Sequence, residues 1–261
     1  MAGNLSRVLG LPVDAELVRT ATREAFALYG RYWYETFALR TMPWNEVDRR
    51  FRATGVEHID QGLAAGRGVI VALPHMGNWD AAGHWLAGRG YPIVAVAEEL
   101  RPAGVYELFY RHRRALGMRI VPLQQGVGER LARLLTENHV VALLSDRNIG
   151  GRGVSVDFFG EPASLPAGPA LLARTTGAAL LPCVVYTAED GWRCRVGEPM
   201  DVPSGGRGRD AVAATTGELA GCFERFISAA PADWHMFQTV WEADLAESRR
   251  EAGDGAGRAA A

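Results

Sequence analysis

One histidine and one aspartate lie close together in a segment whose residue types suit acid–base chemistry. The segment Leu73–Asp80 (LPHMGNWD) places His75 five residues before Asp80, with Pro74 and Gly77 shaping a turn between them. A carboxylate that reaches one imidazole nitrogen fixes the tautomer of the ring and leaves the other nitrogen free to accept a proton. The spacing therefore predicts that Asp80 orients His75 as a general base for activating a hydroxyl.

Taken alone, the pair also has a purely structural interpretation. His75 would be a hydrogen-bonded turn residue, and Asp80 would complement the dipole of the following helix. The neighbouring residues favour the catalytic interpretation. The order of His75, Gly77, Asn78, Trp79 and Asp80 resembles the HxxxxD motif of glycerolipid acyltransferases. More narrowly, it resembles the HxGNW(D/E) form of the bacterial lipid A biosynthesis acyltransferase family.

Further segments resemble the same family in the same order along the chain. Ser145–Arg147 (SDR), followed by Val156–Glu161 (VDFFGE), resembles its second motif. Tyr110–Met118 (YRHRRALGM) resembles the helix whose arginine faces the active site, with Arg113 at the matching position. The C-terminal Pro231–Met236 (PADWHM) is similar to the actinobacterial branch of the family, which acylates phosphatidylinositol mannosides.

The resemblance implies a reaction and a set of site residues. A long acyl chain would pass directly from acyl-CoA to a mannose hydroxyl of a phosphatidylinositol mannoside, without a metal or another cofactor. His75 would be the base, Asp80 would hold its imidazole, and Asp146 would orient the histidine or the sugar. Arg113, or a backbone N–H of the turn at residues 76–78, would stabilise the oxyanion. The expected substrate-binding residues are Asn78, Trp79, Arg147, Phe158 and Phe159.

Several of these assignments have alternatives. Asp146 can be a solvated loop residue paired with Arg147, whose own expected partner is a phosphate of CoA or inositol. Phe158 and Phe159 can pack in the core instead of lining an acyl groove. A related enzyme that acts on another glycolipid or phospholipid, with acyl-CoA or acyl carrier protein as donor, fits the same motifs. A catalytically silent lipid-binding module is the alternative from a different class.

The elements that must position these residues alternate between apolar runs and amphipathic stretches. Buried strands are predicted at residues 68–73, 93–97, 119–121, 140–144 and 180–186, and an antiparallel edge strand at 192–196. Helices are predicted at residues 15–39, 79–87, 103–116, 127–137, 168–176 and 210–227. This order predicts an α/β fold with a mostly parallel central sheet flanked by helices on both faces. His75 then lies at the carboxyl end of a strand, where such sheets bind ligands.

One domain is expected over residues 1–250, with residues 1–54 as an N-terminal helical cover and residues 251–261 as a disordered tail. The net charge of -2 argues against a dedicated nucleic-acid binder. All 28 basic residues are arginine, which excludes lysine chemistry. No histidine–carboxylate cluster has metal-ligand spacing.

Membrane attachment is expected without a membrane-spanning segment. The three cysteines are scattered, which indicates a reducing compartment, and the N-terminus lacks the pattern of a signal peptide. No apolar run approaches the roughly 20 residues that cross a bilayer. The predicted location is the cytoplasmic face of the plasma membrane, with the inner-membrane surface as partner. The expected lipid contacts are the aromatic side chains of residues 15–39 together with Trp234, Phe237 and Trp241.

Overall fold

The computed structural model describes residues 1–99, 101–149, 153–203, 205 and 207–245. A central sheet contains seven strands of the described chain: β1 (Phe51–Thr54), β2 (Val69–Leu73), β3 (Ile93–Ala97), β4 (Arg119–Pro122), β5 (Val140–Leu144), β8 (Ala179–Ala188) and β9 (Gly191–Val196). Their order is β1-β9-β8-β2-β5-β3-β4. All neighbours are parallel except β8 and β9, which form an antiparallel hairpin.

The centre of the sheet is apolar on both faces because helices cover both. All five residues of β2 are buried, and β2 lies between β5 and β8. A separate antiparallel hairpin joins β6 (Gly153–Phe158) to β7 (Glu161–Pro166). The predicted α/β fold with a mostly parallel sheet is confirmed.

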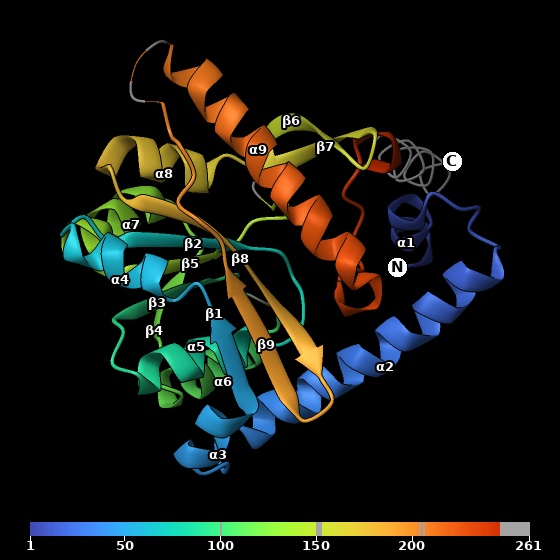
Figure 1. Ribbon diagram of the computed structural model, residues 1–261, viewed down its shortest axis with the longest axis horizontal. Helices are drawn as coiled ribbons and strands as arrows, with labels where there is room; N and C mark the ends of the chain where they lie inside the picture. Colours follow the sequence, from blue (N-terminus) through green and yellow to red (C-terminus); the bar gives the residue numbers. More distant parts are fainter. Residues whose placement is uncertain (100, 150–152, 204, 206, 246–261) are drawn as a thin grey trace, which may run out of the picture.

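The helices are α1 (Ala2–Leu9), α2 (Glu16–Ala38), α3 (Trp44–Arg50), α4 (Glu57–Ala64), α5 (Trp79–Gly88), α6 (Ala103–Ala115), α7 (Val127–Thr136), α8 (Gly168–Thr176), α9 (Gly208–Ala229) and the short 3₁₀ helix η1 (Pro231–Asp233). Helices α7, α8 and α9 pack on one face of the sheet, together with the β6–β7 hairpin. Helices α3, α4, α5 and α6 pack on the other face. Figure 1 shows α9 crossing in front of the sheet, with α5 and α6 below it.

The long helix α2 runs along one margin of the molecule, from α1 to α3 (Figure 1). It packs against η1 and against α5. A small apolar core under α1 and α2 contains Leu5, Val18, Ala25 and Ala232. This core joins the first helices of the chain to the segment that follows α9, so two distant parts of the sequence meet beside α5.

Two expectations about the elements need correction. The strand at residues 192–196 was expected at the edge of the sheet, but β1 pairs with it in parallel, with Phe51 opposite Trp192. Residues 1–54 were expected to form only a helical cover, yet their last four residues are this edge strand β1. Helices α1, α3 and α4 were not predicted. The tail expected at residues 251–261 lies outside the described residues.

Candidate active site

The segment between β2 and α5 forms a tight turn that carries His75. Gly77 has a φ of 56°, and a Cβ there would lie 2.4 Å from the carbonyl oxygen of Val185. Only glycine satisfies both conditions without strain. Asn78 then caps α5, because its Oδ1 accepts the Ala81 N–H at 2.9 Å. Backbone and cap together fix the direction in which His75 leaves the sheet.

His75 is paired with Asp146, which follows the neighbouring strand. Leu73 and Leu144 are in register at the carboxyl ends of β2 and β5, so the next residues of both strands meet. His75 Nδ1 lies 2.6 Å from Asp146 Oδ1, and the His75 backbone N–H donates to Asp146 Oδ2 at 2.9 Å. A carboxylate at this distance fixes the proton on Nδ1 and leaves Nε2 as the acceptor. This is the geometry of a general base.

Asp146 is fully buried and is held by three N–H donors. The third is the indole N–H of Trp234, which donates to Asp146 Oδ2 at 2.8 Å. Burial alone would raise the pKa of Asp146, but the charge of His75 and these hydrogen bonds outweigh it and lower the pKa below its usual value. Asp146 is therefore held as a carboxylate beside His75.

The segment after α9 clamps the turn from the other side. The Gly77 N–H donates to the Asp233 carbonyl at 3.1 Å, and the His235 N–H donates to the His75 carbonyl at 2.8 Å. Met76 and Trp234 form an isolated antiparallel bridge between these bonds. The turn is therefore held by Asp146, which follows β5, and by the C-terminal segment as well as by its own helix.

Asp80 does not hold His75, which corrects the role expected from the motif spacing. Its carboxylate binds the Arg113 guanidinium through two bonds, Nε to Oδ1 at 2.6 Å and Nη2 to Oδ2 at 3.1 Å. The Tyr32 hydroxyl also donates to Asp80 Oδ2, at 2.9 Å. Asp80 lies in the first turn of α5, from which its side chain reaches α2 and α6. The predicted His75–Asp80 contact is replaced by an Asp80–Arg113 ion pair.

The buried Asp80–Arg113 ion pair shifts the pKa values of the groups around it. Burial disfavours the charged form of Arg113, but the adjacent Asp80 carboxylate outweighs this and raises the pKa of the guanidinium. Burial, followed by the Asp80 charge, raises the pKa of the Tyr32 hydroxyl far above its usual value. Arg113 is thus a fixed cation, and its Nη1 is not used by Asp80.

An apolar cavity of about 840 Å³, counting its opening to solvent, lies on the α5–α6 face of the sheet. Its floor includes Val71, Ala142 and Ala95, which are neighbours in register on β2, β5 and β3. It extends along the strands to Leu73 and Leu144, directly before the segments that carry His75 and Asp146. Trp79, Asp80 and Arg113 also line it. The apolar lining, with Asp80 and Arg113 as its charged groups, is typical of the composition of a small-molecule site.

The residues expected to bind substrate occupy different environments. Trp79 lines the cavity, and its ring meets that of His75 edge-on with centroids 5.5 Å apart. Arg147 pairs with Glu98 beyond the ends of β5 and β3. Asn78 is buried with both ends of its amide engaged inside the protein, so its side chain does not face a ligand.

Phe158 and Phe159 correct the expectation of an acyl groove at the β6–β7 turn. Phe158 is fully buried and packs against Trp234 and Trp241 in the core beneath α9. Phe159 packs against the same core at the hairpin turn. The apolar cavity lies on the opposite face of the sheet.

Two of the three expected lipid contacts at the C-terminus need the same correction, whereas Phe237 is only partly buried. Trp234 and Trp241 are fully buried, and their indole N–H groups donate to Asp146 and to the Phe158 carbonyl.

Two of the backbone N–H groups expected as oxyanion donors already have hydrogen-bond partners within the protein. Met76 donates to Pro74, and Gly77 donates to Asp233. Of the expected oxyanion donors, Arg113 is therefore favoured over these two amides.

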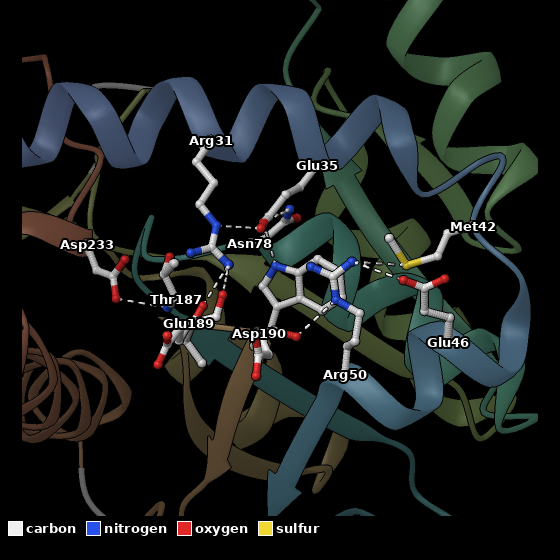
Figure 2. Close-up of polar contacts among 12 residues, drawn as sticks. Arg31, Glu35, Met42, Glu46, Arg50, Asn78, Thr187, Glu189, Asp190 and Asp233 are labelled. Carbon is white, nitrogen blue, oxygen red and sulfur yellow. Dashed lines mark hydrogen bonds and ion pairs between the residues drawn. The ribbon is translucent and has the colours of Figure 1, made fainter.

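Three residues of the site were not assigned to it from the sequence: Tyr32, Glu35 and Trp234. Figure 2 shows Glu35 and Arg31 descending from α2 toward Asn78. Tyr32 and Glu35 are one helical turn apart, so they share a face of α2. The sequence signal that could have assigned Tyr32 and Glu35 to the site is a hydroxyl and a carboxylate on an otherwise aromatic helix face. Buried polar groups need hydrogen-bond partners, so such a pair indicates polar contacts with a neighbouring element.

The family is decided by comparison with known proteins. The sequence matches the family described as bacterial lipid A biosynthesis acyltransferase over residues 1–243. The chain belongs to this family. It is 45% identical over 254 residues to a phosphatidylinositol mannoside acyltransferase of Mycobacterium tuberculosis, covering 95% of this chain and 78% of that protein. It is 42% identical over 250 residues to the protein of the same name from Mycolicibacterium smegmatis, covering 95% and 80%.

A more distant relative extends the comparison. The chain is 26% identical over 211 residues to a lipid A biosynthesis acyltransferase of Haemophilus influenzae, covering 80% of this chain and 63% of that protein. The predicted family resemblance and the predicted enzyme class are confirmed. This protein is an acyltransferase.

Proposed function

We propose that this acyltransferase moves a long fatty acyl chain from acyl-CoA to a mannose hydroxyl of a phosphatidylinositol mannoside. The acceptor is inferred from the names of relatives that are 42–45% identical over 95% of the chain. The observation that carries the proposed chemistry is His75, held through Nδ1 by a buried carboxylate next to an apolar cavity.

In the proposed reaction, His75 acts as a base toward the acceptor. Nε2 removes the proton of the mannose hydroxyl while the oxygen attacks the thioester carbonyl. The resulting tetrahedral intermediate breaks its C–S bond, the ester remains on the sugar, and the CoA sulfur takes the proton from the imidazolium. Asp146 holds the ring and stabilises its charge during this cycle. The acyl group passes directly between the two substrates, without an acyl-enzyme.

Arg113 is the proposed donor to the oxyanion. Its Nε and Nη2 are bound by Asp80, which fixes the plane of the guanidinium and leaves Nη1 free of that carboxylate. Arg113 and Asp80 both line the cavity. A rigid donor in a site that excludes water stabilises developing negative charge without reorganisation. Asp80 thus contributes to catalysis through Arg113 instead of through His75.

The apolar cavity is the proposed place of the acyl chain. Its floor runs along β2 and β5 toward the strand ends, so a chain lying there would present its thioester near the His75 turn. Burial of each methylene contributes about 0.8 kcal/mol. This favours long acyl donors over short ones. Arg147, beyond the end of β5, remains a candidate partner for a phosphate of either substrate.

The proposed location is the cytoplasmic face of the plasma membrane, with the protein attached peripherally. Among the described helices, none has the length and apolarity to cross a bilayer. Tyr34 and Phe37 on α2 and Leu108 on α6 are exposed. We call these three residues the α2–α6 patch. Phe109 lies beside it, contacting the Phe37 ring on one side and the Arg113 guanidinium on the other. The patch is therefore the proposed lipid contact, close to the site.

The proposal is tested by product analysis with a panel of substrates. Purified protein is incubated with palmitoyl-CoA, or with palmitoyl-acyl carrier protein, and with mannosylated and unmannosylated phosphoinositides in detergent. We expect mass spectrometry to show one added acyl group on the mannosylated lipids, with acyl-CoA as the better donor. Acylation of the unmannosylated lipid alone would overturn the acceptor, and transfer only from the carrier protein would overturn the donor. No transfer to any lipid would support a silent lipid-binding module.

A further inference from the structure

Glu35 is a buried carboxylate on α2 that accepts from three side chains: one on α2 itself, one on β9 and one at the end of the His75 turn. Its Oε1 accepts the Arg31 Nε–H at 2.6 Å, and its Oε2 accepts the Trp192 indole N–H at 2.7 Å. The same Oε2 accepts from the Asn78 amide Nδ2 at 3.3 Å. Figure 2 shows Glu35 between Arg31 and Asn78, with the Arg31 guanidinium continuing to the β8–β9 turn.

The contact with Glu35 decides the orientation of the Asn78 amide. Asn78 Oδ1 accepts the Ala81 N–H and thereby caps α5. A flipped amide would present an NH₂ group to that N–H and an oxygen to the carboxylate, which is unfavourable on both sides. Because Glu35 can only accept, it selects the orientation that caps the helix. Arg31 in turn fixes the carboxylate.

We infer that Glu35 is a positioning residue for His75, acting through Asn78. The turn from Pro74 to Asn78 is attached at its first end by Asp146 and in the middle by the Asp233 carbonyl. At the last residue of the turn, the Asn78 side chain bonds Ala81 within α5 and Glu35 on α2, so within the described residues its hydrogen bond to α2 is the one with Glu35. The inference rests on the proposed function of His75 and assigns to α2 a part in catalysis.

The direct test is Glu35→Gln. An amide at this position has one oxygen, so it cannot accept from Arg31 on one side and from Asn78 and Trp192 on the other. We expect kcat to fall about 10- to 100-fold with KM for the donor nearly unchanged, because a small displacement of a catalytic group has an effect of this size. The matched control is Trp192→Phe, which removes another donor to Glu35 but leaves Asn78 paired. We expect Trp192→Phe to lower the Tm while its kcat stays within about twofold of the wild-type value.

A polarity exchange separates positioning from stability. Asn78→Asp keeps an oxygen for the helix cap but places a second carboxylate beside Glu35, so kcat falls. In the double variant with Glu35→Gln, the new amide can donate to the new carboxylate. We expect kcat of the double variant to exceed that of Asn78→Asp by about tenfold. Simple multiplication of the two single losses would contradict a direct Glu35–Asn78 contact.

An NMR readout keeps this inference separable from the proposed function. The ring signals of His75, identified by their absence in His75→Ala, are followed in the folded variants without any substrate. We expect them to shift in Glu35→Gln and Asn78→Asp and to stay in place in Trp192→Phe. Wild-type signals and wild-type kcat in Glu35→Gln would overturn the positioning role and leave the acyl transfer intact. If the signals shift in the variants but the wild-type protein acylates no lipid, the acyl transfer alone is overturned. Should Glu35→Gln not fold, Asn78→Asp tests the same contact.

Discussion

His75 and Asp146 form the pair on which the proposed chemistry depends. The carboxylate is fully buried and accepts three N–H groups, so its position is fixed before any substrate arrives. The imidazole is the partly exposed member of the pair, with its side chain 20% exposed. The buried carboxylate thus fixes the orientation of a partly exposed imidazole whose Nε2 is not used by Asp146.

Asp146→Asn should lower kcat by up to about 10⁴-fold, the effect of changing the orienting carboxylate of a catalytic histidine to an amide. An amide that donates to Nδ1 stabilises the tautomer with its proton on Nε2, which cannot act as a base. Steady-state kinetics with palmitoyl-CoA measure the effect, and a Tm close to the wild-type value shows that the fold is retained. A folded Asp146→Asn protein with wild-type kcat would exclude Asp146 from the mechanism.

His235 provides a test of the clamp on the turn through pH. Burial lowers its pKa to about 4, and neither ring nitrogen has a partner among the described residues. Between about pH 4 and the usual histidine value of about 6.5, the unfolded chain binds the proton more strongly. Stability therefore falls as the pH is lowered through this window.

We expect this residue to remove about 2 kcal/mol of unfolding free energy between pH 7 and pH 5. His235→Phe preserves the aromatic contacts with Tyr29, Tyr32 and Trp79 but cannot bind a proton. Urea unfolding at both pH values should show a smaller loss in the variant by this amount. Equal losses in the two proteins would mean that His235 titrates normally in the fold.

The identities of the site residues were predictable, but their pairing was not. The motif placed His75, Asp80, Asp146 and Arg113 together, and the structure brings all four to one end of the sheet. The spacing suggested an Asp80–His75 contact, whereas Asp146 reaches His75 from 71 residues away. That contact requires β2 and β5 to be neighbours. Strand adjacency depends on tertiary packing, which a local motif does not contain.

At the scale of the elements, the helix α2 acts as a support of the site and not only as a cover. One face carries Tyr32 and Glu35, which reach the first residues of α5, and another carries the exposed Tyr34 and Phe37. The periodicity predicted the helix itself within a residue at each end. The same pattern could not distinguish its faces, because aromatic side chains occur on both.

The cavity on β2, β3 and β5 makes a prediction about chain length. Ala142 lies in its floor, and Ala142→Leu would fill part of the space along the strands. We expect the ratio of kcat/KM for palmitoyl-CoA over octanoyl-CoA to fall about tenfold or more, since pockets discriminate by roughly this factor per methylene. The control is Ala132→Leu on α7, which packs against the core of the opposite face. Unchanged chain-length preference in Ala142→Leu would exclude this cavity as the acyl site.

The predicted strands include the continuous apolar runs at the centre of the sheet, whereas β1, β6 and β7 were not among the predicted strands. β1 has four residues and a mixed burial pattern, so its composition does not separate it from a loop. It becomes a strand because β9 offers a free edge beside it. Its absence from the prediction also explains why β9 was expected at the edge.

At the scale of the whole molecule, both ends of the described chain meet beside the site. Arg7 on α1 pairs with Asp244 and Glu161 and lies over the ring of Trp241. Asn4 donates to the carbonyls of Met236 and Gln238. These contacts hold the C-terminal segment that clamps the His75 turn. The first helix therefore supports the site over a long distance in sequence.

The α2–α6 patch predicts how the molecule meets lipid. Replacing Tyr34, Phe37 and Leu108 together by serine should weaken binding to vesicles containing phosphatidylinositol by at least about tenfold, because three exposed apolar side chains lose their burial in the membrane. Vesicle sedimentation measures the effect. The control is Leu171→Ser, an equally exposed leucine on α8. Equal sedimentation of the triple variant and the wild type would show that lipid is met elsewhere.

Product formation by the wild type and by His75→Ala, compared in one assay, is the most direct measurement of the proposed mechanism. Both proteins are incubated with palmitoyl-CoA and a phosphatidylinositol mannoside. The masses of the lipids and of the intact proteins are then measured by mass spectrometry. We expect an acylated glycolipid from the wild type, none above background from folded His75→Ala, and no added acyl mass on either protein. Undiminished product from His75→Ala, or a stable acyl group on the wild-type protein, would contradict direct transfer by this histidine.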